Sequence, residues 1–73
     1  MRINGYYIRV QGQVGQQLAE WFVDLKIAPE IVDESVLIVP SNDQAFLFGV
    51  LLRIRDFGIR LLSVNPILDE DLT

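Results

Sequence analysis

Two hydrophobic periods alternate along this chain, and the order in which they occur limits the folds that it can adopt. Apolar residues occupy every second position of Tyr6–Gln11, which is typical of a strand with one buried face. Further on they recur at helical spacing, which predicts an amphipathic helix over Val14–Leu25. Later in the chain strand-like residues are again followed by apolar residues at helical spacing. We therefore expect the order strand, helix, strand, strand, helix, strand.

Prolines distinguish the edge strands from the central ones. Lys26–Val32 is predicted to lie at an edge, because Pro29 cannot donate a hydrogen bond to a central ladder. Val36–Val39 is an unbroken aliphatic run, which favours a central strand covered on both faces. Ile59–Val64 is expected to be the last strand, ended by Asn65-Pro66.

The second helix is predicted over Asp43–Phe57. Before it, Pro40-Ser41-Asn42-Asp43 supplies a stop and N-cap side chains, and after it Gly58 suits the left-handed residue that ends a helix. Arg53 and Arg55 lie in its last turns, where positive charge offsets the helix dipole.

This order of elements, with two right-handed crossovers, predicts an α+β fold. We expect a ferredoxin-like βαββαβ plait, with an antiparallel four-stranded sheet in the order 4-1-3-2 and two helices on one face. A two-helix sandwich with another strand order is the alternative. Residues 1–67 are expected to form one domain, and residues 68–73 an acidic C-terminal tail.

The absence of cysteine and histidine excludes several kinds of chemistry at once. Disulfides, Cys/His zinc sites, thiol nucleophiles and imidazole acid–base catalysis all need these residues. No serine lies in a Gly-x-Ser-x-Gly motif, and Ser41 is explained by helix capping. Asp33 and Glu34 share a solvated turn, and the acidic residues 69–71 match no calcium loop. We therefore expect no catalytic residue, no cofactor and no metal.

Charge and hydropathy limit the partners. The net charge is −4, but three acids lie in the last five residues, so the rest of the chain is nearly neutral. Such a surface is poorly suited to a phosphate backbone, and we expect no nucleic-acid binding. The longest apolar stretch, Ala45–Leu52, is far shorter than the ~20 residues that cross a bilayer. We expect no membrane partner and a cytoplasmic location.

The second helix carries more apolar side chains than one small core can cover. Phe48 and Leu52 are four residues apart and point away from the stripe that faces the sheet. Gly49 beside them costs roughly 1 kcal/mol relative to alanine inside a helix. Close approach of another backbone is one reason for a glycine at this position.

The predicted sheet has a similar surplus, because the helices cover only one of its faces. The open face is expected to carry Tyr7, Arg9, Leu61, Ser63 and two residues of Val36–Val39. Two coincident surpluses favour a symmetric homodimer, and we prefer the sheet face as its interface. The alternative is that scattered surface aliphatic residues need no partner.

Arg9 and Arg60 are the most notable polar pair, because they are expected on neighbouring strands. Arg9 could hold an anionic ligand, pair with Glu30 or Asp33 across a dimer, or extend along the sheet rim. Arg53 and Arg55, introduced above, are further candidates for ligand or partner contacts.

Two remaining features are interpreted as structural. Gly12 and Gly15 flank the turn into the first helix, where neither a P-loop nor a dinucleotide fingerprint is present, so a structural turn is favoured over an anion cradle. Trp21 lies in the apolar stripe of the first helix and is expected in the core.

Several motifs of the sequence resemble a known group of proteins. They are Val10-Gln11-Gly12, Trp21-Phe22, Asp43-Gln44-Ala45, Arg53-Ile54-Arg55-Asp56-Phe57-Gly58 and Leu61-Leu62-Ser63-Val64. Over about Tyr6 to Val64 the chain resembles a family of very short bacterial proteins without assigned function. It is also faintly similar to ACT-type regulatory domains, through the order of elements and the Gly15…Leu18 start of the first helix. The first resemblance implies no site residue, and the second implies small-molecule sensing.

Our functional hypothesis is a non-enzymatic interaction or adaptor domain that self-associates as a homodimer and can have a further protein partner. Its possible interface residues are Tyr7, Arg9, Leu61, Phe48 and Leu52. The alternative is an ACT-like domain that senses an anionic small molecule near Arg9 and Arg60 or at the start of the first helix.

Overall fold

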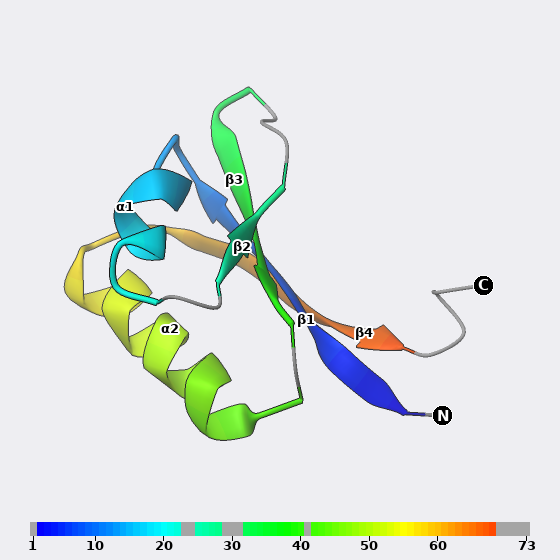
Figure 1. The fold of residues 1–73 in the computed structure, drawn as a ribbon. Helices are drawn as coiled ribbons and strands as arrows, with labels where there is room; N and C mark the ends of the chain where they lie inside the picture. The colour runs from blue at the N-terminus through cyan, green and yellow to red at the C-terminus, as the bar shows by residue number, and fades with distance from the viewer. Residues whose placement is uncertain (1, 23–24, 29–31, 41, 69–73) are drawn as a thin grey trace.

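The computed structural model describes residues 2–22, 25–28, 32–40 and 42–68, and its elements follow the predicted order (Figure 1). The elements are β1 (Ile3–Gln11), α1 (Gly15–Ala19), β2 (Lys26–Ile27), β3 (Glu34–Val39), α2 (Gln44–Asp56) and β4 (Leu61–Leu68). The predicted α+β class is therefore confirmed.

The four strands form one antiparallel sheet in the order β2-β3-β1-β4, which is the predicted 4-1-3-2 read from the other edge. Both helices lie against the same face of this sheet, and no helix formed by the described residues lies on the opposite face (Figure 1). We call the uncovered side the open face.

The core lies between the helices and the sheet. In β1 the predicted alternation is confirmed, because Tyr6, Ile8 and Val10 are buried while Tyr7 and Arg9 are exposed. Residues of α1, β3 and α2 also contribute to the core, and its buried members there are Leu18, Leu37, Val39, Leu47, Val50 and Ile54. Val36 and Ile38 of β3, whose side chains lie on the other face of the sheet, are only half-buried. The prediction that β3 is covered on both faces is therefore wrong. The reason is that only one helical layer exists.

Helix α2 forms where it was predicted. The carboxylate of Asp43 accepts hydrogen bonds from the backbone N–H groups of Ala45, at 2.9 Å, and Phe46, at 3.2 Å. Gly58 has φ +70°, which is the left-handed conformation expected just beyond the helix. The N-cap is Asp43, and Ser41, to which a capping role was assigned, lies outside the described residues.

Helix α1 is much shorter than the predicted Val14–Leu25. After Ala19 the backbone tightens, because the N–H groups of Trp21 and Phe22 bond to carbonyls three residues earlier. This tightening changes the directions of the side chains that follow. Leu25 still reaches the core, but Trp21 is 53% exposed, so its predicted core position is wrong.

The edge strands also differ from their predicted bounds. Strand β2 has only two residues; Val32 lies outside it, and residues 29–31, including Pro29 and Glu30, lie outside the described residues. Strand β4 starts later than predicted and continues through Asn65-Pro66 to Leu68. Pro66 is tolerated because β4 is an edge strand, where a missing N–H group breaks no central ladder. Leu68, predicted to begin the tail, ends a strand, and residues 69–73 lie outside the described residues.

Candidate functional site

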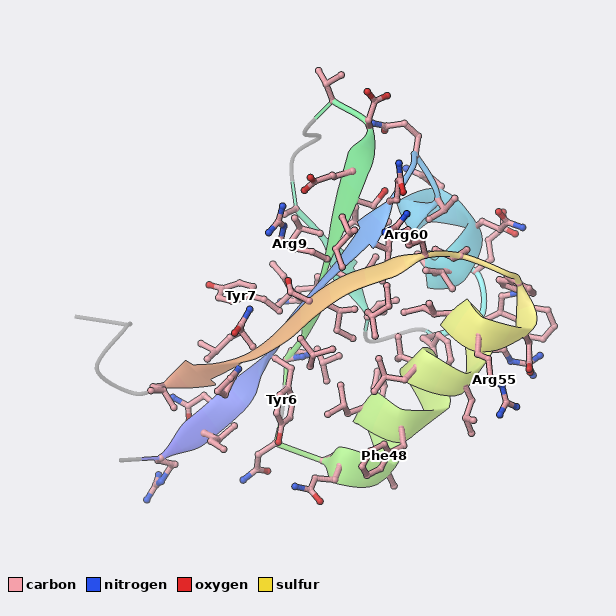
Figure 2. All side chains as sticks on the ribbon, turned by 180° about the vertical axis from the view of Figure 1, so that it is seen from behind. Tyr6, Tyr7, Arg9, Phe48, Arg55 and Arg60 are labelled. Atoms are coloured by element: carbon pink, nitrogen blue, oxygen red, sulfur yellow. The ribbon has the colours of Figure 1, made fainter. Side chains whose placement is uncertain are left out.

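The open face of the sheet carries a mixed apolar and polar surface. The register pairs Tyr7 with Ile38 on one side and with Asn65 on the other, and it pairs Arg9 with Val36 and Ser63. Directly paired residues share a face of the sheet. The two residues of Val36–Val39 expected on this face are therefore Val36 and Ile38. Figure 2 shows Tyr7 and Arg9 on the side away from α2.

Tyr7 is the most exposed apolar side chain in the middle of the open face, at 41%. Its neighbour Ile38 is half-buried, and Ile67, opposite Gly5 at one end of the face, is buried. The hydroxyl of Ser63, opposite Arg9, is buried and has no hydrogen-bond partner among the described residues. This face thus combines a half-exposed aromatic centre with an unsatisfied polar group.

Arg9 is already paired within the chain. Its Nη2 lies 2.6 Å from Oε1 of Glu34, and its Nε lies 3.1 Å from the same oxygen. Because Glu34 is on the neighbouring strand β3, neither Asp33 nor a second copy is needed to neutralise Arg9. The guanidinium is therefore not a free anion receptor, contrary to one sequence-based hypothesis.

Arg60 does not combine with Arg9 into one site. It precedes β4 and is exposed, and its carbonyl accepts a 2.9 Å hydrogen bond from the backbone N–H of Gln11. Figure 2 shows the two arginine side chains well separated. The structure thus gives no support to an anion held between them.

A β-bulge changes the predicted placement of Leu61. The register shifts between Arg9 and Val10, so that Leu61 pairs with the buried Val10 and Ser63 pairs with Arg9. Leu61 consequently lies in a row that faces the helices, and its prediction on the open face is wrong. Leu62 is the extra, unpaired residue of the bulge. It is 40% exposed, although the alternation of apolar residues in this strand predicts that its side chain points toward the core.

The outward face of α2 is apolar, as predicted. Phe48 is 56% exposed and Leu52 is 49% exposed, whereas Leu51 packs partly against the core. Among the described residues no other backbone approaches Gly49, because a methyl group at its Cα would meet only Cε1 of Phe22, at 3.8 Å. Close approach of another backbone, the reason predicted for a glycine here, is therefore not found among the described residues of one copy.

An aromatic and cationic cluster lies between the end of α1 and the last turns of α2. The guanidinium carbon of Arg53 is 4.1 Å from the centroid of the Trp21 ring, and the Phe57 ring is 6.1 Å from the Trp21 ring. Sequence analysis missed this cluster because it placed Trp21 in the core. Arg55, by contrast, pairs with Asp56 at 3.2 Å on the exposed side of the helix.

The turn that leads into α1 is held by Ser35 of β3. The Ser35 hydroxyl donates to the carbonyl of Gly12, at 2.6 Å, and accepts from the N–H of Val14, at 3.1 Å. At Gly15 a methyl group would come within 2.9 Å of the Ile27 side chain, so only glycine lets α1 pack closely on β2. These contacts favour the structural interpretation of the turn.

A pocket of about 350 Å³ lies beside this turn. It is lined by Gln13, Gly15, Gln16, Ile27, Ala28, Glu34 and Ser35. These residues include no lysine or arginine, so the described lining offers no charged partner to an anionic ligand. No group of three or more acidic side chains that could hold a metal ion occurs among the described residues.

A family model described as a domain of unknown function, DUF8691, matches residues 5–65. The chain belongs to this family. The DUF8691 match covers nearly the same segment as the resemblance predicted from the sequence motifs, and it includes most of β1 and the first half of β4. No curated protein and no solved structure matches the chain, so the similarity to ACT-type domains is not shown. Within the described residues, no helix is long and apolar enough to span a membrane.

Proposed function

We propose that this DUF8691 protein is a non-enzymatic interaction domain, folded as a ferredoxin-like plait, that forms a homodimer through its open face. The observation that carries the proposal is that the helices cover only one side of the sheet. Tyr7 therefore stands half-exposed at the centre of the other side, beside the half-buried Val36 and Ile38. Face-to-face packing of two sheets brings such rows together around a two-fold axis.

The polar groups of the open face are compatible with this arrangement. Arg9 is neutralised by Glu34 of the same chain, so a dimer that covers this pair does not bury an unpaired charge. Burial of 500 Å² of apolar surface would contribute roughly 12 kcal/mol before the costs of association. The interface therefore needs no additional ion pair between the copies.

The matched variants Tyr7→Lys and Phe48→Lys test which surface associates. Both place a charge at an exposed aromatic residue, one on the open face and one on the outward face of α2. By light scattering over a dilution series, we expect wild type and Phe48→Lys to be dimeric and Tyr7→Lys to be monomeric. A wild-type monomer at millimolar concentration would refute dimerisation. Dissociation by Phe48→Lys alone would assign the interface to α2.

A cytoplasmic location and the absence of nucleic-acid partners belong to the same proposal. The small, nearly neutral body supports the second point, because nucleic-acid binding needs a basic surface. Fractionation of the native cell tests the first point. Electrophoresis with single-stranded and duplex oligonucleotides tests the second, and a retarded band would contradict it.

The pocket beside α1 favours small-molecule sensing as a second candidate function. A thermal-shift screen of amino acids and nucleotides tests it, since a ligand at 100 times its Kd stabilises by about 2.7 kcal/mol, or roughly 10–20 °C. We expect Gln16→Ala to reduce such a shift and Tyr7→Lys to preserve it. If no compound raises the unfolding midpoint, this candidate is refuted.

A further inference from the structure

Trp21, Arg53 and Phe57 form a surface on the helical layer, which we call the tryptophan surface; Trp21 is exposed, and Arg53 and Phe57 are half-buried. Trp21 is the single tryptophan of the chain and is 53% exposed, in a position where the apolar pattern predicts burial. Arg53 covers part of its ring, and Phe57 packs against it in a tilted arrangement, with 54° between the ring planes. Tryptophan and arginine are the residues most enriched at the energetic centres of protein interfaces.

Arg53 differs from two other arginines of the chain in its partners. Arg9 is paired with Glu34 and Arg55 with Asp56. Among the described residues, by contrast, no carboxylate pairs with Arg53, and its guanidinium stacks on the Trp21 ring. Stacking engages the face of a guanidinium and leaves its five N–H donors free at the edge. As far as the described residues go, Arg53 is thus a cation held in place whose donors no carboxylate engages.

A carboxylate is the ligand that fits these donors best. Its two oxygens match the guanidinium fork in a bidentate arrangement that does not disturb the stacking on Trp21. An apolar side chain next to the carboxylate could contact the exposed part of the Trp21 ring and Phe57. A long polyanion fits less well, because the chain outside its last five residues is nearly neutral and so lacks the extended basic surface that a phosphate backbone needs.

We propose that the tryptophan surface binds an acidic segment of a partner protein, with an Asp or Glu side chain on Arg53 and an apolar side chain on Trp21. This inference rests on the proposed function, because it names the partner chemistry of the interaction domain. Both helices lie on the side of the sheet opposite the open face (Figure 1), so a dimer formed through that face leaves this surface accessible.

The probe is a synthetic peptide Leu-Asp-Glu-Asp-Leu, acetylated at its N-terminus and amidated at its C-terminus so that only side chains supply carboxylates; it has the required chemistry and the sequence of residues 68–72. Its matched control is Leu-Asn-Gln-Asn-Leu. Because the protein has one tryptophan, Trp21 fluorescence reports directly on the surface. We expect a saturable change with the acidic peptide, weakened at least tenfold in the amide peptide and reduced by added salt.

Two arginine variants locate the binding. Arg53→Gln should abolish the response, Arg53→Lys should weaken it by retaining the charge without the fork, and Arg55→Gln should leave it unchanged. Because Arg53 stacks on Trp21, its substitution changes the fluorescence of the free protein, so calorimetric titration measures the affinities of the same variants independently. Thermal unfolding midpoints check that each variant is folded. Equal effects of Arg53→Gln and Arg55→Gln, or equal binding of the two peptides, would overturn the proposal.

If nucleic acid or a second copy of the chain occupies the tryptophan surface instead, the binding measurements give different results. Tighter binding of a single-stranded oligonucleotide than of the acidic peptide would assign the surface to nucleic acid and overturn the proposal. A change in Trp21 fluorescence when the free protein is diluted would show that a second copy covers the surface, which also overturns it. A monomeric protein that still binds the peptide through Arg53 would refute the homodimer and leave this inference intact.

Discussion

Substitution of Gly49 by alanine tests both the packing of α2 and the choice of interface. Gly49 lies in the interior of the helix, where glycine is about 1 kcal/mol less favourable than alanine. The added methyl group would meet Cε1 of Phe22 at 3.8 Å, an ordinary van der Waals contact. In the part of the chain that the structure describes, no contact therefore opposes the gain in helix propensity.

The expected size of the effect follows from these two observations. Gly49→Ala should stabilise the folded protein by about 0.5–1 kcal/mol, chiefly because alanine restricts the unfolded chain. For a domain of this length, 1 kcal/mol corresponds to roughly 4–8 °C, so the unfolding midpoint should rise by about 2–8 °C.

Thermal unfolding followed by circular dichroism, at two protein concentrations at least a hundredfold apart, measures this effect. The reverse change Ala45→Gly, at an exposed position of the same helix, is the control and should lower the midpoint. A lower midpoint for Gly49→Ala at both concentrations would refute the packing argument. Destabilisation at the high concentration alone would show that a second copy approaches the helix at Gly49, which contradicts dimerisation through the open face.

Three further substitutions probe the contacts that hold the elements together, each measured by urea unfolding. Gly15→Ala should destabilise by about 1–3 kcal/mol, because its methyl group would lie 2.9 Å from the Ile27 side chain, and the loss should shrink in an Ile27→Ala background. Ser35→Ala should cost about 1–3 kcal/mol, since it leaves the N–H of Val14 and the carbonyl of Gly12 without their partner; a loss below 0.5 kcal/mol would contradict this. Asp43→Ala should cost about 1 kcal/mol by removing the N-cap of α2, whereas Asp43→Asn should restore most of it.

The two proposed surfaces of this DUF8691 protein lie on opposite layers, which is the arrangement that an adaptor needs. The open face is the proposed site of self-association, and the tryptophan surface is the proposed site of a different partner. Their exposed aromatic residues, Tyr7 and Trp21, belong to different elements and can be altered independently.

Local patterns were sufficient to predict the elements that form through local interactions. Helix α2 needs only its apolar stripe, the Asp43 cap and Gly58, which lie together in the sequence. The alternation in β1 likewise identifies its buried face, because successive side chains of a strand point to opposite sides. The order of the strands followed from the order of the elements and their two crossovers, and the positions of proline and of the aliphatic run agreed with it.

Details of the backbone geometry, which the apolar pattern does not encode, decided the features that the pattern did not predict. The length of α1 and the exposure of Trp21 depend on the tightening after Ala19, although the apolar period continues to Leu25. The placement of Leu61 depends on a bulge in the pairing of β4 with β1, and a shift of one residue changes the face that a side chain occupies.

The sequence by itself therefore determined the kinds of element, their order and most of the core, because apolar burial follows the local period of the backbone. Only the tertiary structure decided which charges are neutralised and which aromatic rings remain exposed. The pairing of Arg9 with Glu34 and the stacking of Arg53 on Trp21 each join residues at least 25 positions apart. Their geometry depends on how the strands and helices meet, and no local pattern records it.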